Sequence, residues 1–235
     1  MTVEQFTHAL AEKGIILNEE QLGQYNRYWE LLVEWNEKMN LTGITEKEDV
    51  YLKHFYDSLT LAFHFDINKI TSMCDVGSGA GFPGIPLKIA FPHLELTIVD
   101  SLNKRITFLN TVVSELGLQG VNPVHARAEE YVEKHREEFD LATARAVARL
   151  NMLAELCLPF VKTSGYFVAM KGASGKEELS EAKSGLKILG GKIQEEITLQ
   201  LPEEESQRSI IIVEKTKSTP KKYPRAFGQI KKKPL

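Results

Sequence analysis

Hydrophobic residues follow two different periods along the chain, and the change comes near residue 70. Before it, apolar side chains recur at helical spacing, as at Leu22, Tyr25 and Trp29. Asn18 stands just before this pattern and is followed by two glutamates, which is typical of a helix N-cap. A second helical stretch is expected over residues 46–65. No strand-like alternation occurs in this part of the chain.

After residue 70, short apolar runs alternate with helical segments. The runs predict seven strands, at 70–76, 94–100, 120–126, 139–144, 165–171, 191–201 and 208–215. Helices are expected between or beside them at 86–91, 104–117, 128–136, 149–161 and 175–190. This alternation predicts a parallel sheet with helices on both faces. We expect the last strand to be antiparallel and to pair with the sixth.

Composition places the chain among globular proteins, with 43% hydrophobic and 26% charged residues. No apolar run is long enough to predict a membrane span, and the N-terminus lacks a secretory signal, so a cytoplasmic location is expected. Two cysteines inside apolar segments are expected to be buried thiols, and no metal site is expected. We divide the chain into a helical extension (1–65), an α/β core (66–216) and a basic tail (217–235).

Charge is distributed unevenly along the chain. The net charge is −3, but residues 215–235 carry eight basic side chains and no acidic one, whereas the rest carries 21 basic and 32 acidic residues. Such a tail indicates a polyanionic partner, and Tyr223 and Phe227 favour nucleic acid because aromatic rings stack on bases. The alternative is a solvated tail without a partner. Candidates for RNA contact here are Lys221, Lys222 and Arg225.

A glycine-rich loop, DVGSGAGFPG (75–84), follows the first expected strand. Glycines let the backbone turn and approach a ligand, and ligands of open α/β sheets bind at the carboxyl ends of strands. One register, G-x-G-x-x-G from Gly79, suits a dinucleotide with Asp100 on its ribose. A second, D-x-G-x-G-x-G from Asp75, resembles the loop of class I S-adenosylmethionine-dependent methyltransferases. The two expected strands after the fifth suit the methyltransferase register better than the dinucleotide register. A third interpretation is a tight turn between strand and helix that binds no ligand.

Several segments together closely resemble the ribosomal RNA small subunit methyltransferase G family, also called glucose-inhibited division protein B. They are WNEKMNLTGIT (35–45), HFYDSL (54–59), DVGSGAGFPGIPLKI (75–89), VDSLNKRITFL (99–109), ARAEE (126–130), ATARAVARLN (142–151) and AMKG (169–172). The resemblance implies a class I methyltransferase fold, Rossmann-like, with a seven-stranded, mostly parallel sheet. It also implies methyl transfer from S-adenosylmethionine to guanine N7 in small-subunit (16S) ribosomal RNA in the bacterial cytoplasm.

The resemblance and the strand positions assign candidate site residues. Those for the cofactor are Asp75, Gly77, Gly79, Phe82, Asp100, Ser101, Ala128, Glu129 and Arg145. Arg145 and Lys171, at the ends of two strands, are expected to position the substrate. Candidates for RNA, besides the tail residues, are Lys104, Arg105 and Arg127. Arg127, Arg145 and Lys171 are expected to form a basic rim suited to phosphates.

Residue chemistry alone leaves other interpretations open. Phe82 can be ordinary core, Glu129 a first-turn helix charge, and Arg145 the partner of a helix acid. His54 and Asp57 are three residues apart on one predicted helix. They are either a catalytic dyad or, as we expect, a structural polar cluster that joins the N-terminal helices to the core.

The implied reaction requires no general base, because guanine N7 has a free lone pair and no proton to lose. Alignment of the reacting atoms can then supply about 7–11 kcal/mol. The expected partner is small-subunit RNA or the assembled small subunit, and we expect a monomer. Rival hypotheses are an NAD-dependent dehydrogenase, a non-catalytic RNA-binding factor, and a methyltransferase for small molecules or proteins.

Overall fold

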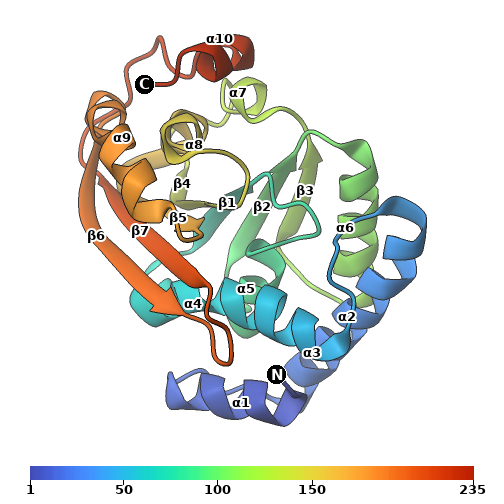
Figure 1. Cartoon of the computed structure of the whole chain (residues 1–235). Coiled ribbons are helices and arrows are strands. Elements are labelled where there is room, and N and C mark those ends of the chain that lie inside the picture. Colours follow the sequence, from blue (N-terminus) through green and yellow to red (C-terminus); the bar gives the residue numbers. More distant parts are fainter.

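A seven-stranded sheet lies between two layers of helices in the computed structural model, which describes residues 1–235 (Figure 1). The strands are β1 (Ser72–Val76), β2 (Glu95–Asp100), β3 (Val121–His125), β4 (Phe139–Arg145), β5 (Val161–Lys171), β6 (Gly191–Gln200) and β7 (Gln207–Lys215). Their order is β3-β2-β1-β4-β5-β7-β6. Strands β1 to β5 are parallel, and β7 is antiparallel to β5 and β6, as expected. Strand order reverses between β1 and β4, so a ligand is expected at their carboxyl ends.

Helices occupy nearly all the predicted positions. They are α1 (Val3–Glu12), α2 (Glu19–Met39), α3 (Lys47–Val50), α4 (Asp57–His64), α5 (Gly84–Ala90), α6 (Asn103–Glu115), α7 (Ala128–Tyr131), α8 (Leu150–Cys157), α9 (Gly175–Ile188) and α10 (Phe227–Lys232). A π-helical segment, Tyr51–Tyr56, joins α3 to α4, so the stretch expected over 46–65 is helical but irregular. None of the helices combines the length and apolar character needed to cross a membrane.

Helix α7 is shorter than predicted and ends at Tyr131. Glu137, a little further on, has a φ of 53°, in the left-handed region. Its carboxylate lies 3.1 Å from Lys215 Nζ and accepts a 2.8 Å hydrogen bond from the amide of Thr219. These contacts with the end of the chain fix the backbone in a turn, so tertiary structure overrides the local helical pattern.

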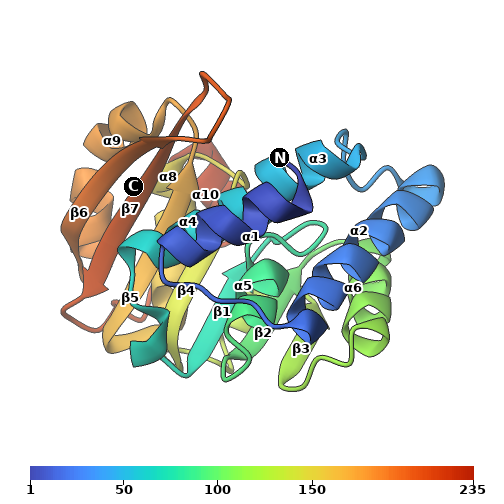
Figure 2. The same ribbon diagram turned by 90° about the horizontal axis from the view of Figure 1, so that it is seen from below.

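The two faces of the sheet bury separate hydrophobic layers. In β7, Ile210 and Ile212 belong to the layer under the N-terminal helices, α5 and α6, while Ile211 and Val213 belong to the layer under α8 and α9. This alternation is the two-residue period of a strand. Figure 2 shows the helices on either side of the sheet. Both faces are therefore covered, as the continuous apolar runs predict.

The N-terminal helices share a hydrophobic layer with the α/β core. Asn18 caps α2 by accepting a hydrogen bond from Gln21 N, as predicted. From the same helix, Tyr25 donates a hydrogen bond to Pro86 O at 2.7 Å and Tyr28 donates one to Ala80 O. Helix α2 therefore supports the glycine-rich loop directly from behind.

The basic tail is folded onto the core beside α8 (Figure 1). Arg225 forms an ion pair with Glu155, which is fully buried in α8, with 2.6 Å between Nη2 and Oε2. Ile230 of α10 is fully buried, and Arg136 donates hydrogen bonds to three carbonyls of the tail. The tail is thus neither a solvated appendage nor a free arm. Arg225, predicted to contact RNA, has its guanidinium held by the Glu155 carboxylate, whereas Lys221 and Lys222 are exposed.

Removing the guanidinium of Arg225 should destabilise the whole protein. In Arg225→Ala, the buried carboxylate of Glu155 loses its partner, and an unpaired buried charge typically costs about 3–5 kcal/mol. Urea unfolding followed by circular dichroism measures the free energy of unfolding. Lys221→Ala, which removes an equal charge from an exposed tail position, is the control and should change stability by less than about 0.5 kcal/mol. Equal effects of the two variants would contradict this account of the tail.

Candidate functional site

Three adjoining cavities lie over the carboxyl ends of the strands. We call them the apolar cavity, the central cavity and the polar cavity, with volumes of about 190, 370 and 410 Å³. The apolar and central cavities share Gly77, Ser101 and Val147 as lining residues. The central and polar cavities share His54, Arg145 and Ala146. The three cavities therefore form a row across the end of the sheet, which we call the path, rather than one pocket.

The glycine-rich loop forms one wall of the central cavity. Gly77 has a φ of 70°, and a Cβ there would lie 2.9 Å from a methyl group of Val147, so a side chain is excluded. The loop leaves the backbone of Gly77, Ser78 and Gly79 against the cavity. Gly84 has a different reason to be glycine, because a Cβ there would lie 2.6 Å from the Asp75 carboxylate. The third glycine of the dinucleotide register thus serves internal packing.

Asp75, a predicted cofactor residue, lies beneath the loop and does not line any of the three cavities. Its side chain is fully buried, and Oδ2 accepts a 2.7 Å hydrogen bond from the amide of Gly84. Oδ1 has no hydrogen-bond partner, and burial raises the pKa of this carboxyl well above its usual range. In this structure Asp75 supports the start of α5 and thereby the shape of the loop.

Asp100, at the end of β2, lies at the wall of the central cavity beside the loop. Its two oxygens accept hydrogen bonds from Gly79 N at 3.1 Å and Leu102 N at 2.9 Å. Arg105 approaches the same carboxylate at 3.4 Å and also lines the central cavity. Arg105, predicted to contact RNA, therefore faces the ligand path from its first helical turn, whereas Lys104 is exposed.

The apolar cavity contains a residue that the sequence did not identify as part of a pocket. Phe227 of α10 lines it together with Ala128 and Glu129, which were predicted cofactor residues. The ring of Phe227 lies 4.8 Å from the guanidinium carbon of Arg127, and Arg127 Nε lies 2.6 Å from Glu129. The tail aromatic interpreted as a base-stacking group is thus one wall of this cavity. The sequence gives no sign of this role, because Phe227 lies among basic residues and only the fold brings it beside Arg127.

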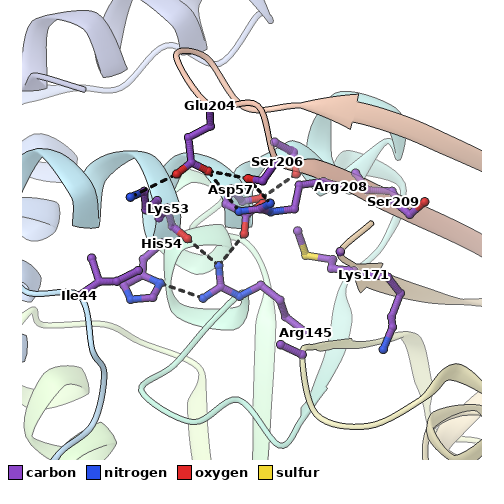
Figure 3. A pocket seen from close by; sticks show the side chains of 15 residues that line it. Ile44, Lys53, His54, Asp57, Arg145, Lys171, Glu204, Ser206, Arg208 and Ser209 are labelled. Atoms are coloured by element: carbon purple, nitrogen blue, oxygen red, sulfur yellow. Dashed lines mark hydrogen bonds and ion pairs between the residues drawn. The ribbon is translucent and has the colours of Figure 1, made fainter. Parts of the chain in front are cut away.

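Arg145 forms the wall between the central and polar cavities. Its Nη1 donates hydrogen bonds to Asp57 Oδ2 at 2.8 Å and to the Lys53 carbonyl at 3.0 Å (Figure 3). Its guanidinium carbon also lies 5.0 Å from the centre of the Phe82 ring. Phe82 is buried and stacks on His54, with ring centres 4.4 Å apart. The structure thus places Arg145 at the ligand path and pairs it with a helix acid at the same time.

His54 has a defined tautomer in this arrangement. Its Nδ1 faces Arg145 Nη2 at 3.0 Å, and because a guanidinium can only donate, Nδ1 accepts. The ring proton is therefore on Nε2, which donates to Thr42 Oγ1 at 2.8 Å. Burial and the adjacent guanidinium lower the pKa of His54 to about 3. This confirms a structural polar cluster that joins the π-helical segment to β4, and the neutral ring is not free to act as a base.

Lys171, at the end of β5, lines the polar cavity but its ammonium is already bound. It lies 2.9 Å from Glu178 Oε2 of α9 and donates a 2.5 Å hydrogen bond to Ala148 O. Arg127 lines the apolar cavity, whereas Arg145 and Lys171 line the polar cavity. The three basic residues expected to form one rim are therefore spread along the path, and each has an acidic partner.

The apolar and central cavities fit a nucleoside that carries a charged chain. The apolar cavity offers aliphatic and aromatic walls for a base, and Asp100 offers a carboxylate for sugar hydroxyls. The loop offers backbone beside a small buried hydroxyl, Ser78 Oγ, that has no partner within the protein. The polar cavity adjoins the far end of this site through the shared wall at His54 and Arg145.

Comparison with known proteins agrees with this geometry. The model of the family described as rRNA small subunit methyltransferase G (GidB) matches residues 21–210. A protein named ribosomal RNA small subunit methyltransferase G from Lysinibacillus sphaericus is 59% identical, and the alignment covers both chains completely. One of the same name from Bacillus velezensis is 57% identical over all of this chain and 99% of its own.

Solved structures share the fold at low sequence identity. M. jannaschii TYW2 in complex with AdoMet has a TM-score of 0.56 at 13% identity, covering 69% of this chain and 76% of its own. The 16S rRNA (adenine(1408)-N(1))-methyltransferase of Catenulisporales acidiphilia has a TM-score of 0.53 at 15% identity, covering 66% and 87%. These likenesses confirm the class I methyltransferase fold that the sequence predicts. The family model matches most of this chain, and the two named relatives are 57–59% identical to it over almost their whole length. This chain therefore belongs to the rRNA small subunit methyltransferase G family.

Proposed function

We propose that this chain transfers the methyl group of S-adenosylmethionine to N7 of a guanine in 16S ribosomal RNA. The observation that carries the proposal is that three cavities adjoin one another at the carboxyl ends of the strands in a member of this family. Two of them suit a nucleoside with a charged chain, and the third opens beside its far end. The polar cavity would receive the base that accepts the methyl group.

The cofactor-binding roles follow from the positions of the side chains. Phe227 and Ala128, which line the apolar cavity, would hold the adenine. Asp100 would accept hydrogen bonds from the ribose hydroxyls, and Gly77 and Gly79 would let the backbone approach the methionine part. Asp75 acts indirectly, by fixing the start of α5 through Gly84. Ser101 lines both cavities, so it would lie where the adenine joins the ribose.

The chemistry requires alignment rather than proton transfer. The bound cofactor supplies a methyl group that is electrophilic because it is attached to a sulfonium. Arg145, fixed by Asp57 and by the Lys53 carbonyl, forms the rigid wall against which the base is positioned. The Arg145–Asp57 pair is close to neutral overall, which suits a reaction in which positive charge moves from sulfur to the guanine ring. Lys171, held by Glu178, orders the other side of the polar cavity.

Isolated small subunits that lack the modification provide the direct test of this function. The full-length protein is incubated with them and S-adenosylmethionine labelled on the methyl group, and the labelled nucleotide is mapped. We expect label on one guanine, as 7-methylguanine. Free nucleosides and a protein-only fraction serve as controls for small-molecule and protein methylation. Label on either of those, or on a pyrimidine or adenine of the RNA, would overturn the proposal.

Two variants separate the parts of the cofactor site. Asp100→Asn removes the charged acceptor for the ribose, and Phe227→Ala removes a wall of the adenine cavity. Hydrogen bonds to charged groups contribute about 1.5–3 kcal/mol, so the first should raise the Kd for S-adenosylmethionine roughly 10- to 150-fold. Isothermal titration measures both variants, with Lys221→Ala as an exposed control and NAD as a competitor. Unchanged affinity in both variants, or competition by NAD, would contradict the assigned cavity.

Activity and stability should depend on pH in different ways. Because the folded pKa of His54 is about 3 and its ordinary value is 6.5, the unfolded chain binds the proton more readily. The stability that neutral His54 contributes is therefore complete above pH 6.5 and is lost as pH falls towards 3. We expect single-turnover rates to be constant from pH 6.5 to 8.5, while Tm falls between pH 6.5 and 4 and falls less in His54→Gln. A rate that follows a group titrating near pH 6.5 would instead indicate a histidine base.

A further inference from the structure

The outer wall of the polar cavity is an acidic hairpin tip folded over basic side chains. The connection between β6 and β7 contains Glu203, Glu204 and Glu205, and the middle one of these lines the cavity. Its carboxylate lies 3.2 Å from Lys53 Nζ and 3.6 Å from Arg208 Nη2 (Figure 3). It also accepts a 2.8 Å hydrogen bond from Ser206 Oγ. Three donors from two distant segments thus converge on one oxyanion.

A phosphate suits the same donors as this carboxylate. Lys53 comes from the π-helical segment and Arg208 from β7, and both line the cavity. An ammonium and a guanidinium that approach an oxyanion from two sides are the common means of holding a phosphate. Their side chains are 29% and 23% exposed, so a ligand that displaces the Glu204 carboxylate can reach both from the solvent.

We propose that Lys53 and Arg208 form a binding site for a backbone phosphate of the RNA substrate, and that the Glu204 carboxylate occupies it until RNA binds. The inference rests on the proposed function, because it assigns a phosphate subsite next to the cavity that receives the base. Glu204 then acts as a gate: a polyanion displaces it, whereas a neutral nucleoside does not.

The ion pairs around the site allow this exchange. When Glu204 moves away, Lys53 keeps Asp49 at 3.1 Å and Arg208 keeps Asp57 at 3.4 Å. Neither cation is left without a carboxylate, so the tip can leave at little electrostatic cost. Leu201 is buried and anchors the start of the connection, while Glu203, Glu205 and Ser206 are exposed. Movement of the tip therefore exposes little apolar surface.

The same contacts connect the phosphate site to the wall of the cofactor cavity. Asp57 Oδ1 lies 3.4 Å from Arg208 Nε in an ion pair, and its Oδ2 accepts a 2.8 Å hydrogen bond from Arg145 Nη1. Arg208 thus contacts both the Glu204 carboxylate that a phosphate would replace and the Asp57 carboxylate that holds Arg145. Only Asp57 stands between the phosphate site and the group that aligns the base.

Charge-neutralising variants of the full-length protein test the site. The variants are Glu204→Gln, Lys53→Gln, their combination, and Glu205→Gln as the matched control with the same charge change one residue away. Filter binding to a 16S RNA transcript is measured over a range of salt concentrations, and KM and kcat are measured on unmodified small subunits. Affinity for S-adenosylmethionine and urea unfolding are measured in parallel, because neither should change much.

Glu204→Gln should strengthen RNA binding about 2- to 5-fold at low salt, the range of an exposed ion pair, and Glu205→Gln should do so clearly less. Lys53→Gln should weaken binding and flatten the slope of log affinity against log salt by about 0.7, the value for one lost contact with a single strand. In the combined variant the gain from Glu204→Gln should shrink, because the two residues interact.

The outcomes separate this site from the proposed function. Equal effects of Glu204→Gln and Glu205→Gln, together with an unchanged salt slope in Lys53→Gln, would overturn the phosphate site. Weaker RNA binding in Glu204→Gln would also overturn the phosphate site. It would indicate that Glu204 only stabilises the hairpin. These results are read from RNA binding, so they stand even if the wild-type protein methylates another base, which would overturn the proposed function alone.

Discussion

The ion pair between Arg145 and Asp57 is the contact on which the arrangement of the site depends. It joins the end of β4 to the first turn of α4, and the two side chains are only 15% and 8% exposed. Separating such a buried pair leaves a charge without a partner, which typically costs about 3–5 kcal/mol. The pair stands where the central and polar cavities meet, so the strength of the contact also fixes the relative position of cofactor and base. The neighbouring His54 ring, neutral and stacked on Phe82, removes the remaining freedom of the guanidinium.

The N-terminal helices are consequently part of the site rather than an attachment to it. The π-helical segment supplies the Lys53 carbonyl, His54 and the approach to Asp57, and α2 supplies the tyrosine that holds the glycine loop through Ala80 O. π-Helical turns are rare and occur often at functional sites. Here the segment presents a carbonyl and an imidazole towards the same arginine (Figure 3). A class I sheet alone would lack one whole wall of both the central and polar cavities.

The sequence predicted the sheet and its helices well, because strand and helix periods are local properties of the chain. All seven strands and the antiparallel last strand were found where the pattern indicates, and the loop and Asp100 follow from their positions at strand ends. The partners of charged residues could not be predicted in the same way. Arg225 is 70 residues from Glu155, and a run of basic residues looks the same whether it faces RNA or a buried carboxylate. Phe227 was missed as a cavity wall for the same reason, since only the folded tail brings it beside Arg127.

Pairing of positive with negative side chains is the common feature of the path. Arg105 has Asp100, Arg145 has Asp57 and Lys171 has Glu178, each within 3.4 Å. A path lined by bare cations would repel a sulfonium before reaction and a methylated guanine after it, and the low dielectric of a cleft would strengthen that repulsion. Neutralised pairs give directional donors without net positive charge. Attraction for the RNA backbone must then come from cations whose partner is replaceable, and Lys53 and Arg208, which share Glu204, are such a pair at the cavity mouth.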